Sequence, residues 1–390
     1  MNPLVDCGLP LFFKVSNPDA VGLSAPPIRL GDVLTTWVRT LSSMQKEALV
    51  YSARTGLAWR LVSDEGEDLN GLGVAPCPLA HFTTGMVASY MNEITAYAGI
   101  LGVGIKHLRL TLDNYYTMEG SMPRRTMVGG ALPVELAVEI DCDLKGDALA
   151  AFIYGAVAAS PLNGLLRGQL TSLFALSLNG GQLKTGEAAP LEGAIHPDPG
   201  DRFAAAVPAD DQAPLVTKGG MTPKIEGAML ETKKGVGYAT DQSRKLHVRG
   251  ICTLRDDGVK EVVQNLFQPI GSEFRYLSDE APEHGGRGLA PDAATYMSAG
   301  IGFCFMTQFG RYATIMKKQL DRYRILQHTH FARGGEPAHT GTTDPVETHV
   351  YLDSPEAEDV ARTVLDMSEQ TCFLHALCRT PTETRVTVGD

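Results

Sequence analysis

Alternating apolar and polar residues predict half-buried strands along the chain, and longer apolar stretches between them predict helices. Ala48–Ser52 and Leu57–Val62 are expected to form a hairpin. After a Gly/Pro-rich segment, a long helix is predicted at about Leu79–Leu101, and its Gly/Ala-rich first half favours close packing against another helix. The following predicted elements are strands at about Lys106–Asp113 and Pro133–Asp141, a helix at Gly146–Ala159 and a strand at Leu170–Leu178.

The same order of elements recurs in the second half of the chain. The expected elements there are a hairpin of Leu246–Leu254 with Phe274–Leu277, a helix at Ala293–Leu320, strands at Arg322–Phe331 and Pro345–Asp353, a helix at Ser354–Thr371 and a strand at Thr384–Val388. The residues repeat as well, because Trp59–Pro76 aligns with Phe274–Pro291 at an offset of 215, with SDE shared. Further on, the offset becomes 212. A period of this length indicates a duplicated domain rather than a solenoid.

Two segments lie outside the repeat. Residues 1–45 form an extension in which Leu30–Met44 is expected to be helical. Residues 179–243 are rich in Gly, Ala and Pro and have little periodicity, as is typical of a linker or a wrapping arm. The predicted organisation is therefore an extension (1–45), a first domain (46–178), a linker (179–243) and a second domain (244–390).

Composition is that of an ordinary globular protein, with 44% hydrophobic and 20% charged residues, which excludes a disordered, collagen-like or coiled-coil chain. The net charge of −11 argues against nucleic acid and anionic lipid as partners. The apolar run Ala148–Ala159 is shorter than the roughly 20 residues that span a bilayer, and the first residues do not resemble a signal peptide. We therefore expect a cytoplasmic protein without a membrane partner.

The seven cysteines form no CxxC pair, so neither a disulfide scaffold nor a zinc finger is expected. Aligning the two copies distinguishes two of these cysteines, because both correspond to serines in the first copy. Cys304, in the long helix of the second copy, corresponds to Ser89, and Cys372 corresponds to Ser160. This pattern predicts one thiol-bearing site, in the second copy.

The order of hairpin, SDE, Gly-rich turn ending in Pro, helix with an embedded Cys and second helix ending in a Cys resembles the OsmC/Ohr family of thiol-dependent peroxidases. The residues that carry the resemblance are Asp279, Gly286, Pro291, the helix SAGIGFCFM with Cys304, and CFLHAL with Cys372. The resemblance implies an α+β fold in which antiparallel sheets wrap around central helices. Since family members are intertwined homodimers, it also implies that this chain is a single-chain pseudo-dimer. Whether such a pseudo-dimer forms a further homo-oligomer is left open.

The same resemblance implies the chemistry. Cys304 would attack an organic hydroperoxide and become a sulfenic acid, Cys372 would condense with it to a disulfide, and a dithiol partner would reduce that disulfide, without a cofactor. An Arg held by a Glu activates the thiol in the family. Arg60 and Arg275 are the candidates here, and Asp292 stands at the place of the Glu. An apolar substrate is expected to lie against Tyr296, Phe303, Phe305 and Met306.

Two other functions stay open. Asp292, one carbon shorter than Glu, and a longer turn favour non-redox catalysis, with Cys304 as nucleophile toward an acyl-type substrate and His375 or an Arg assisting. Alternatively, the chain is a non-catalytic protein that binds a small molecule. Structural roles are also open: Arg60 and Arg275 can form ion pairs with the SDE carboxylates, His375 can lie on a helix surface, and a helical Cys can be an inert core residue.

Four histidines gather in the second copy. His328 and His330 lie two residues apart on one strand face, and His339 and His349 lie in or near the paired strand. Such spacing could bring three imidazoles around a metal ion. Because exposed strand histidines are commoner than metal sites, we expect no metal.

Overall fold

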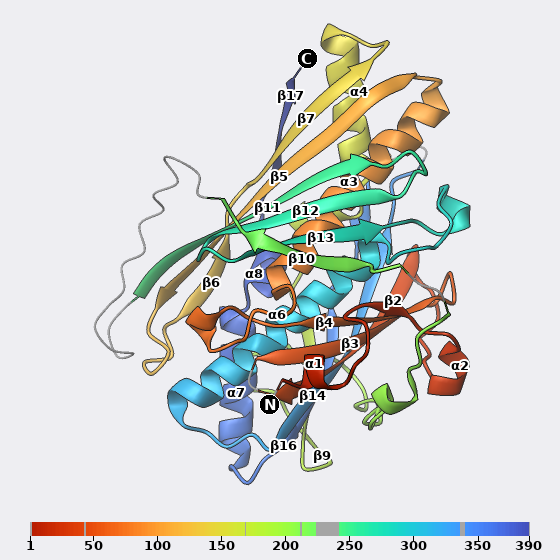
Figure 1. Cartoon of the computed structure of the whole chain (residues 1–390). Coiled ribbons are helices and arrows are strands. Elements are labelled where there is room, and N and C mark those ends of the chain that lie inside the picture. The colour runs from red at the N-terminus through yellow and green to blue at the C-terminus, as the bar shows by residue number, and fades with distance from the viewer. Residues whose placement is uncertain are drawn as a thin grey trace.

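The computed structural model describes residues 2–42, 44–167, 169–210, 213–223, 242–335 and 340–389, and it has an α+β fold with two mixed, mainly antiparallel sheets (Figure 1). In spatial order, the first sheet contains β1 (Phe13–Lys14), β4 (Ala58–Ser63), β3 (Gln45–Ser52), β2 (Asp32–Ser42), β14 (Arg322–Ala332), β16 (Glu347–Asp353), β8 (Leu173–Leu178) and β9 (Gly181–Leu183), with β15 (Thr342–Thr343) beside β14. Neighbouring strands are antiparallel except β16 and β8, which are parallel.

The second sheet has a matching arrangement. It contains β10 (Val216–Met221), β13 (Ser272–Ser278), β12 (Lys260–Gln268), β11 (Gln242–Leu254), β5 (Ile105–Gly120), β7 (Val134–Cys142) and β17 (Thr384–Gly389), with β6 (Val128–Ala131) beside β5. In the first sheet, the meander β2–β3–β4 pairs with β14 of the second half of the chain. In the second sheet, the meander β11–β12–β13 pairs with β5 of the first half. Both halves of the chain therefore contribute strands to each sheet.

Two long helices lie between the sheets. α3 (Pro78–Leu101) packs on the second sheet, α6 (Ala293–Met316) packs on the first, and the helices pack on each other. Glycine allows this close approach: a Cβ on Gly85 would lie 2.6 Å from the carbonyl oxygen of Ala293, and one on Gly300 would lie 2.8 Å from the amide nitrogen of Phe82. The packing expected from the Gly/Ala-rich sequences is therefore observed, in the first halves of both helices.

Shorter helices complete the fold: α1 (Pro3–Asp6), α2 (Pro18–Val21), α4 (Gly146–Ala159), α5 (Leu162–Arg167), α7 (Glu358–Thr371) and α8 (Phe373–Arg379). α4 packs on α3 and α7 packs on α6. The helix predicted at Gly146–Ala159 is confirmed, and the long helix predicted to end at Leu320 ends at Met316 instead.

Two predictions of secondary structure were wrong. The expected helix at Leu30–Met44 is strand β2, because β-branched residues recur along it and most of its residues are buried on both faces, which removes the polar alternation that identifies a strand. The expected pairing of Leu246–Leu254 with Phe274–Leu277 is replaced by two separate pairings, since β12 lies between β11 and β13.

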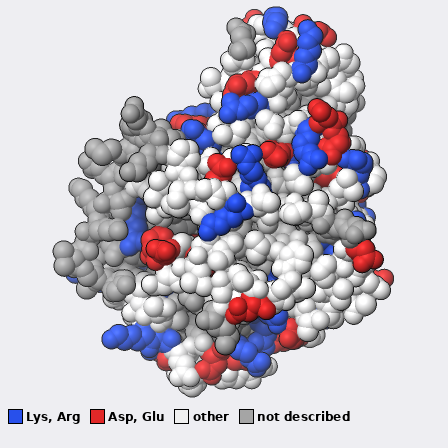
Figure 2. Space-filling model, viewed as in Figure 1, with Lys and Arg blue, Asp and Glu red and all other residues white. Residues whose placement is uncertain are grey.

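The segment after β8 behaves as an arm over the first sheet. Its residues Ile195 and Phe203 pack against a small apolar cluster on the outer face of that sheet, which includes Trp37, Leu326 and Tyr351. The same arm continues to β10, at the edge of the second sheet. On the face seen in Figure 2, Lys and Arg side chains are interspersed with Asp and Glu. No helix in the described part of the chain is long and apolar enough to cross a membrane.

Candidate functional site

Cys304 and Cys372 lie against each other in the interior. Cys304 is on α6, and Cys372 is the junction between α7 and α8. Their exposed fractions are 2% and 0%, both thiols are free, and the two side chains form a hydrogen bond. Two cysteines 68 positions apart in the sequence therefore lie side by side.

The other half of the chain has the same contact between hydroxyls. Ser89 on α3 and Ser160, which ends α4, correspond to the two cysteines, and their Oγ atoms lie 2.7 Å apart. Both serines are buried. The fold therefore brings these two positions together in each half, and one half carries two thiols there.

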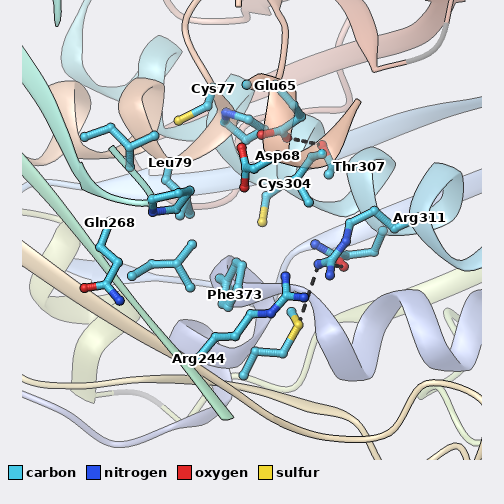
Figure 3. Close-up of a pocket in the computed structure, with 18 of the residues that line it drawn as sticks. Glu65, Asp68, Cys77, Leu79, Arg244, Gln268, Cys304, Thr307, Arg311 and Phe373 are labelled. Carbon is cyan, nitrogen blue, oxygen red and sulfur yellow. Dashed lines mark hydrogen bonds between the residues drawn. The ribbon is translucent and has the colours of Figure 1, made fainter. Parts of the chain in front are cut away.

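Cys304 lines a cavity of about 350 Å³, which is within the usual range for a small-molecule site. From α6, the cavity receives Cys304, Thr307, Gln308 and Arg311, the i, i+3, i+4 and i+7 positions of one helix face. The remaining wall comes from both halves of the chain. The first half contributes Glu65 and Asp68 of the loop after β4, Cys77 at the start of α3, and Met118 on β5. The second half contributes Arg244 on β11, Leu266 and Gln268 on β12, and Phe373 on α8. In Figure 3 the Cys304 sulfur points toward Phe373 and the guanidinium of Arg244.

Opposing effects act on the Cys304 thiol. Burial and the neighbouring Cys372 thiol raise the pKa of Cys304 well above its usual value, and the Glu65 charge adds to this shift. The backbone N–H of Leu374, in the first turn of α8, lowers the same pKa. Lys46 and Arg311 also interact electrostatically with a Cys304 thiolate. Since the net shift is upward, the resting side chain is a thiol.

A buried carboxylate is part of the same group. Glu65 accepts a hydrogen bond of 2.8 Å from Thr307 Oγ1, and its pKa is raised by burial and lowered by Lys46. The Lys46 ammonium is buried as well and donates to the carbonyl of Met44 at 2.5 Å. Glu65 belongs to the SDE run of the first half. This run therefore ends strand β4 and also contributes a side chain to the cavity.

Two guanidinium groups make one side of the cavity positive. Burial and the charge of Arg244 lower the pKa of Arg311, which donates to Gln308 Oε1 at 3.1 Å. Arg244 Nε is buried and has no hydrogen-bond partner among the described residues. Neither arginine forms an ion pair within the described part of the chain. Arg311 could have been found in the sequence, because it lies two helical turns after Cys304.

The arginines proposed from the sequence lie elsewhere. Arg60, on β4, is buried against Glu47 at 2.6 Å. Arg275, on β13, is half-exposed and pairs with Glu261 and Glu273 at 3.2 and 3.4 Å. Both are held by carboxylates of strands β3, β12 and β13 rather than by the SDE runs, and neither lines the cavity.

Asp292 is also outside the cavity. Its carboxylate caps α6 by accepting from the Thr295 N–H at 2.7 Å, and burial with the Glu280 charge raises its pKa to about 7. The corresponding residue at the start of α3 is Cys77, which does line the cavity. The start of α3 therefore brings to the cavity a thiol whose pKa is raised to about 12, chiefly by burial, instead of a carboxylate.

His375 does not face Cys304 across the cavity. It is 1% exposed on α8, with ring centroids 5.4 Å from Phe174 and 4.9 Å from Phe305. Burial lowers its pKa to about 4, and both ring nitrogens are without partners among the described residues. This environment is that of a neutral core residue.

The four side chains predicted to bind substrate are core residues too. Tyr296, Phe303, Phe305 and Met306 are fully buried, and none lines the cavity. Tyr296 donates its hydroxyl proton to the carbonyl of Leu277 at 2.7 Å. Helical geometry explains the other three: Phe303, Phe305 and Met306 are one or two positions from Cys304 and project to other sides of α6.

No family model matches the sequence, and a search of curated proteins finds no match. Among solved structures, the chain is similar to an OsmC-like hydroperoxide resistance protein from Jannaschia sp. CCS1, with 19% sequence identity and a TM-score of 0.21. The similarity covers 32% of this chain and 79% of that protein.

Proposed function

We propose that this chain is a tandem OsmC-like protein, a single-chain pseudo-dimer with one thiol peroxidase site that reduces organic hydroperoxides. The contact between the Cys304 and Cys372 thiols carries the proposal, because a sulfenic acid on one sulfur can condense with the other without unfolding of the helices. Strands from both halves in each sheet support the pseudo-dimer. The cavity beside Cys304 supplies room for an organic substrate.

The reaction balances as follows. The Cys304 sulfur attacks the distal oxygen of the hydroperoxide, the O–O bond breaks, and the thiol proton goes to the departing alkoxide, so that an alcohol and a sulfenic acid form. The Cys372 sulfur then attacks the sulfenic sulfur, and the leaving hydroxide with the second thiol proton gives water. A dithiol partner reduces the disulfide and is itself oxidised.

The surrounding charges suit the first step. Arg311 and Lys46 are close enough to Cys304 to favour its thiolate, and Arg311 also lines the cavity in which the alkoxide would develop. In this proposal Arg311 takes the role that the sequence assigned to Arg60 or Arg275. The non-redox alternative has less support, since His375 is enclosed by aromatic rings and is not in the cavity.

Counting thiols tests the proposal. The purified, reduced protein is titrated with an organic hydroperoxide such as cumene hydroperoxide, and free thiols are counted under denaturing conditions. We expect a fall from seven thiols to five. Cys304→Ser should abolish the fall. Cys372→Ser should lose one thiol and leave a sulfenic acid that dimedone traps.

Two serine variants serve as matched controls. Cys378→Ser removes a buried thiol on α8, the helix that begins at Cys372, and Cys252→Ser removes a buried thiol on β11. Both should still lose two thiols. If the wild-type protein keeps all its thiols but hydrolyses an acyl-type ester in a Cys304-dependent way, the hydrolase is correct. If neither reaction occurs and Cys304→Ser leaves ligand binding unchanged, both enzyme proposals are wrong.

A further inference from the structure

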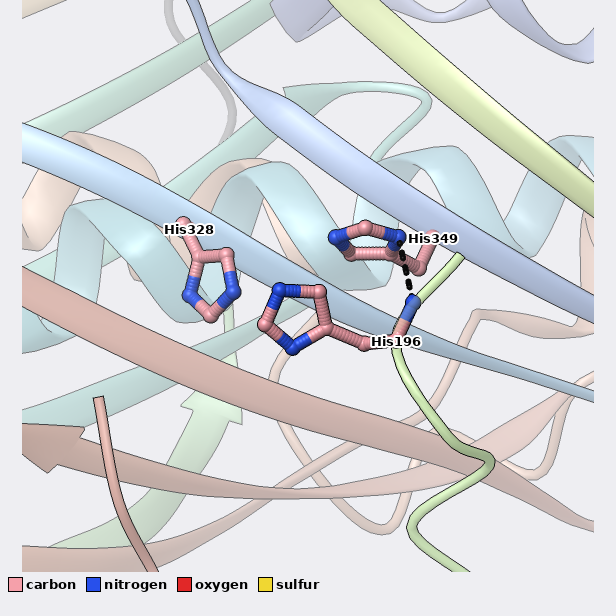
Figure 4. Close-up of side chains that lie close together, drawn as sticks. All are labelled: His196, His328 and His349. Atoms are coloured by element: carbon pink, nitrogen blue, oxygen red, sulfur yellow. Dashed lines mark hydrogen bonds between the residues drawn. The ribbon is translucent and has the colours of Figure 1, made fainter. Parts of the chain in front are cut away.

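Three imidazoles converge on the outer face of the first sheet, away from the cysteines. His328 on β14, His349 on β16 and His196 on the arm each offer a ring nitrogen, and these nitrogens all lie within 4.8 Å of one another (Figure 4). Ring centroids are separated by 4.5 Å for His196 and His349, and by 5.4 Å for His196 and His328. Two of these residues were noticed in the sequence, and His196 was missed.

Sheet register explains the position of two of the rings. His328 pairs with Glu347 and His349 pairs with Leu326, so that the two histidines are diagonal neighbours on one face of adjacent strands. His330, on the same face, is not part of the group. His339 lies outside the described residues.

Polar contacts on either side of His196 hold the third ring in place. The Tyr351 hydroxyl donates to the carbonyl of His196 at 2.8 Å, and Arg324 Nε donates to Asp198 at 2.7 Å. Gln182 Oε1 accepts from the N–H of Ile195 at 3.1 Å. The arm therefore presents His196, which is exposed, toward two buried rings of the sheet.

One buried nitrogen in this group has no hydrogen-bond partner. His328 is 3% exposed, its Nδ1 lies 3.0 Å from Thr35 Oγ1, and its Nε2 has no partner among the described residues. A buried polar atom without a partner is costly, and a bound ligand removes that cost. With a proton on Nδ1 donated to Thr35, Nε2 presents a lone pair, the usual arrangement of a metal-binding histidine.

Metal binding would change one contact of His349. His349 Nδ1 accepts a long contact of 3.4 Å from the His196 backbone N–H. If His349 binds the metal ion through Nε2, its Nδ1 carries a proton and no longer accepts this contact.

We propose that His196, His328 and His349 bind one divalent transition-metal ion, of which Zn²⁺ is the best fit, with water completing the shell. Tetrahedral Zn–N bonds of about 2.0–2.1 Å place ligand nitrogens about 3.4 Å apart. From the 4.8 Å limit, each pair of ligand nitrogens must therefore close by no more than about 1.4 Å. The bound ion would fasten the arm to the first sheet.

Metal titration of tag-free, chelator-treated protein tests this site. We expect one Zn²⁺ per chain by calorimetry and a rise in Tm on adding Zn²⁺. His196→Ala changes an exposed side chain and should weaken binding by at least about tenfold, as should His328→Gln. His107→Ala, at an exposed histidine on β5, is the matched control and should bind like wild type.

Co²⁺ in place of Zn²⁺ distinguishes the ligands. Nitrogen ligation gives visible d–d bands without the intense near-ultraviolet charge transfer of thiolates, whereas ligation by the cysteines gives both. A thiolate band, wild-type affinity in His196→Ala, or no binding at all would each overturn the proposal. Should His328→Gln fold poorly, His196→Ala decides the question.

Discussion

At the scale of single residues, burial outweighs the groups that favour a Cys304 thiolate. The upward pKa shift means that only a small fraction is thiolate at neutral pH; the Leu374 N–H lowers the pKa, and the charges of Arg311 and Lys46 also favour the thiolate. The thiolate is the nucleophile toward a peroxide. Reactivity should therefore depend on pH and on Arg311.

The rate of hydroperoxide consumption should rise about tenfold per pH unit between about pH 7 and pH 9, because the thiolate fraction rises in proportion below the pKa. Arg311→Met should slow the reaction about tenfold, the equivalent of about one unit of pKa. Stopped-flow thiol consumption measures both effects. Arg275→Ala changes an exposed side chain outside the cavity and should react like wild type. A rate that is independent of pH, or a slow Arg275→Ala, would contradict this account.

His375 should affect stability and not catalysis. Its pKa falls from about 6.5 in the unfolded chain to about 4 in the fold, so its contribution to stability is present above about pH 6.5 and is lost as the pH falls toward 4. Between about pH 7.5 and pH 5 the loss is about 2 kcal/mol. His375→Leu should remove this loss, as measured by urea unfolding at both pH values, and should leave thiol consumption unchanged. A variant that folds but consumes no hydroperoxide would show that His375 takes part in the peroxidase reaction.

The cysteine pair could be predicted from the sequence, and the rest of the site could not. Comparing the two copies identified Cys304 and Cys372 because both correspond to serines that share the same contact. The wall residues predicted one or two positions from Cys304 do not line the cavity, because a helix presents Thr307, Gln308 and Arg311 beside Cys304 instead. Arg244 comes from β11 of the second sheet, and no local sequence pattern indicates that this strand lies beside Cys304.

At the scale of elements, the repeat was a better guide than the local pattern. Shifting β3 by the offset of 215 gives residues 260–267, which β12 (Lys260–Gln268) contains, a segment for which no strand was predicted. The same correspondence relates Gly85 to Gly300 at the crossing of α3 and α6. These glycines are therefore expected to be intolerant of a side chain in both halves.

Gly85→Ala should destabilise the protein and Gly99→Ala should not, although both change a glycine of the same helix. A Cβ at Gly85 would meet backbone and side-chain atoms of α6 at 2.6 Å, whereas one at Gly99 meets nothing within 4 Å. The first variant should lose about 2 kcal/mol or more through overpacking, and the second should gain up to about 1 kcal/mol through helix propensity. Chemical denaturation measures both. Equal effects of the two substitutions would mean that the helices do not cross at Gly85.

At the scale of the whole molecule, the sequence indicated two similar halves but not how the arm is used. The arm has little periodicity, so no pattern predicted that it would cover the first sheet or bring His196 beside β14 and β16. Each sheet combines strands from the two halves of the chain. Without β14 the meander β2–β3–β4 has an exposed edge, and without β5 the meander β11–β12–β13 has one.

The two halves should therefore fold together and not separately. We expect residues 1–223 and 242–390, made as separate polypeptides in one cell, to purify as a complex of one copy each, because both sheets need strands from both pieces. Each piece made alone should aggregate or form a homodimer in which a second copy supplies the missing strands. Size-exclusion chromatography with light scattering and thermal unfolding would measure this. Either piece behaving as a monomer with cooperative unfolding would contradict the expectation, since a monomeric half has no partner for its central edge strand.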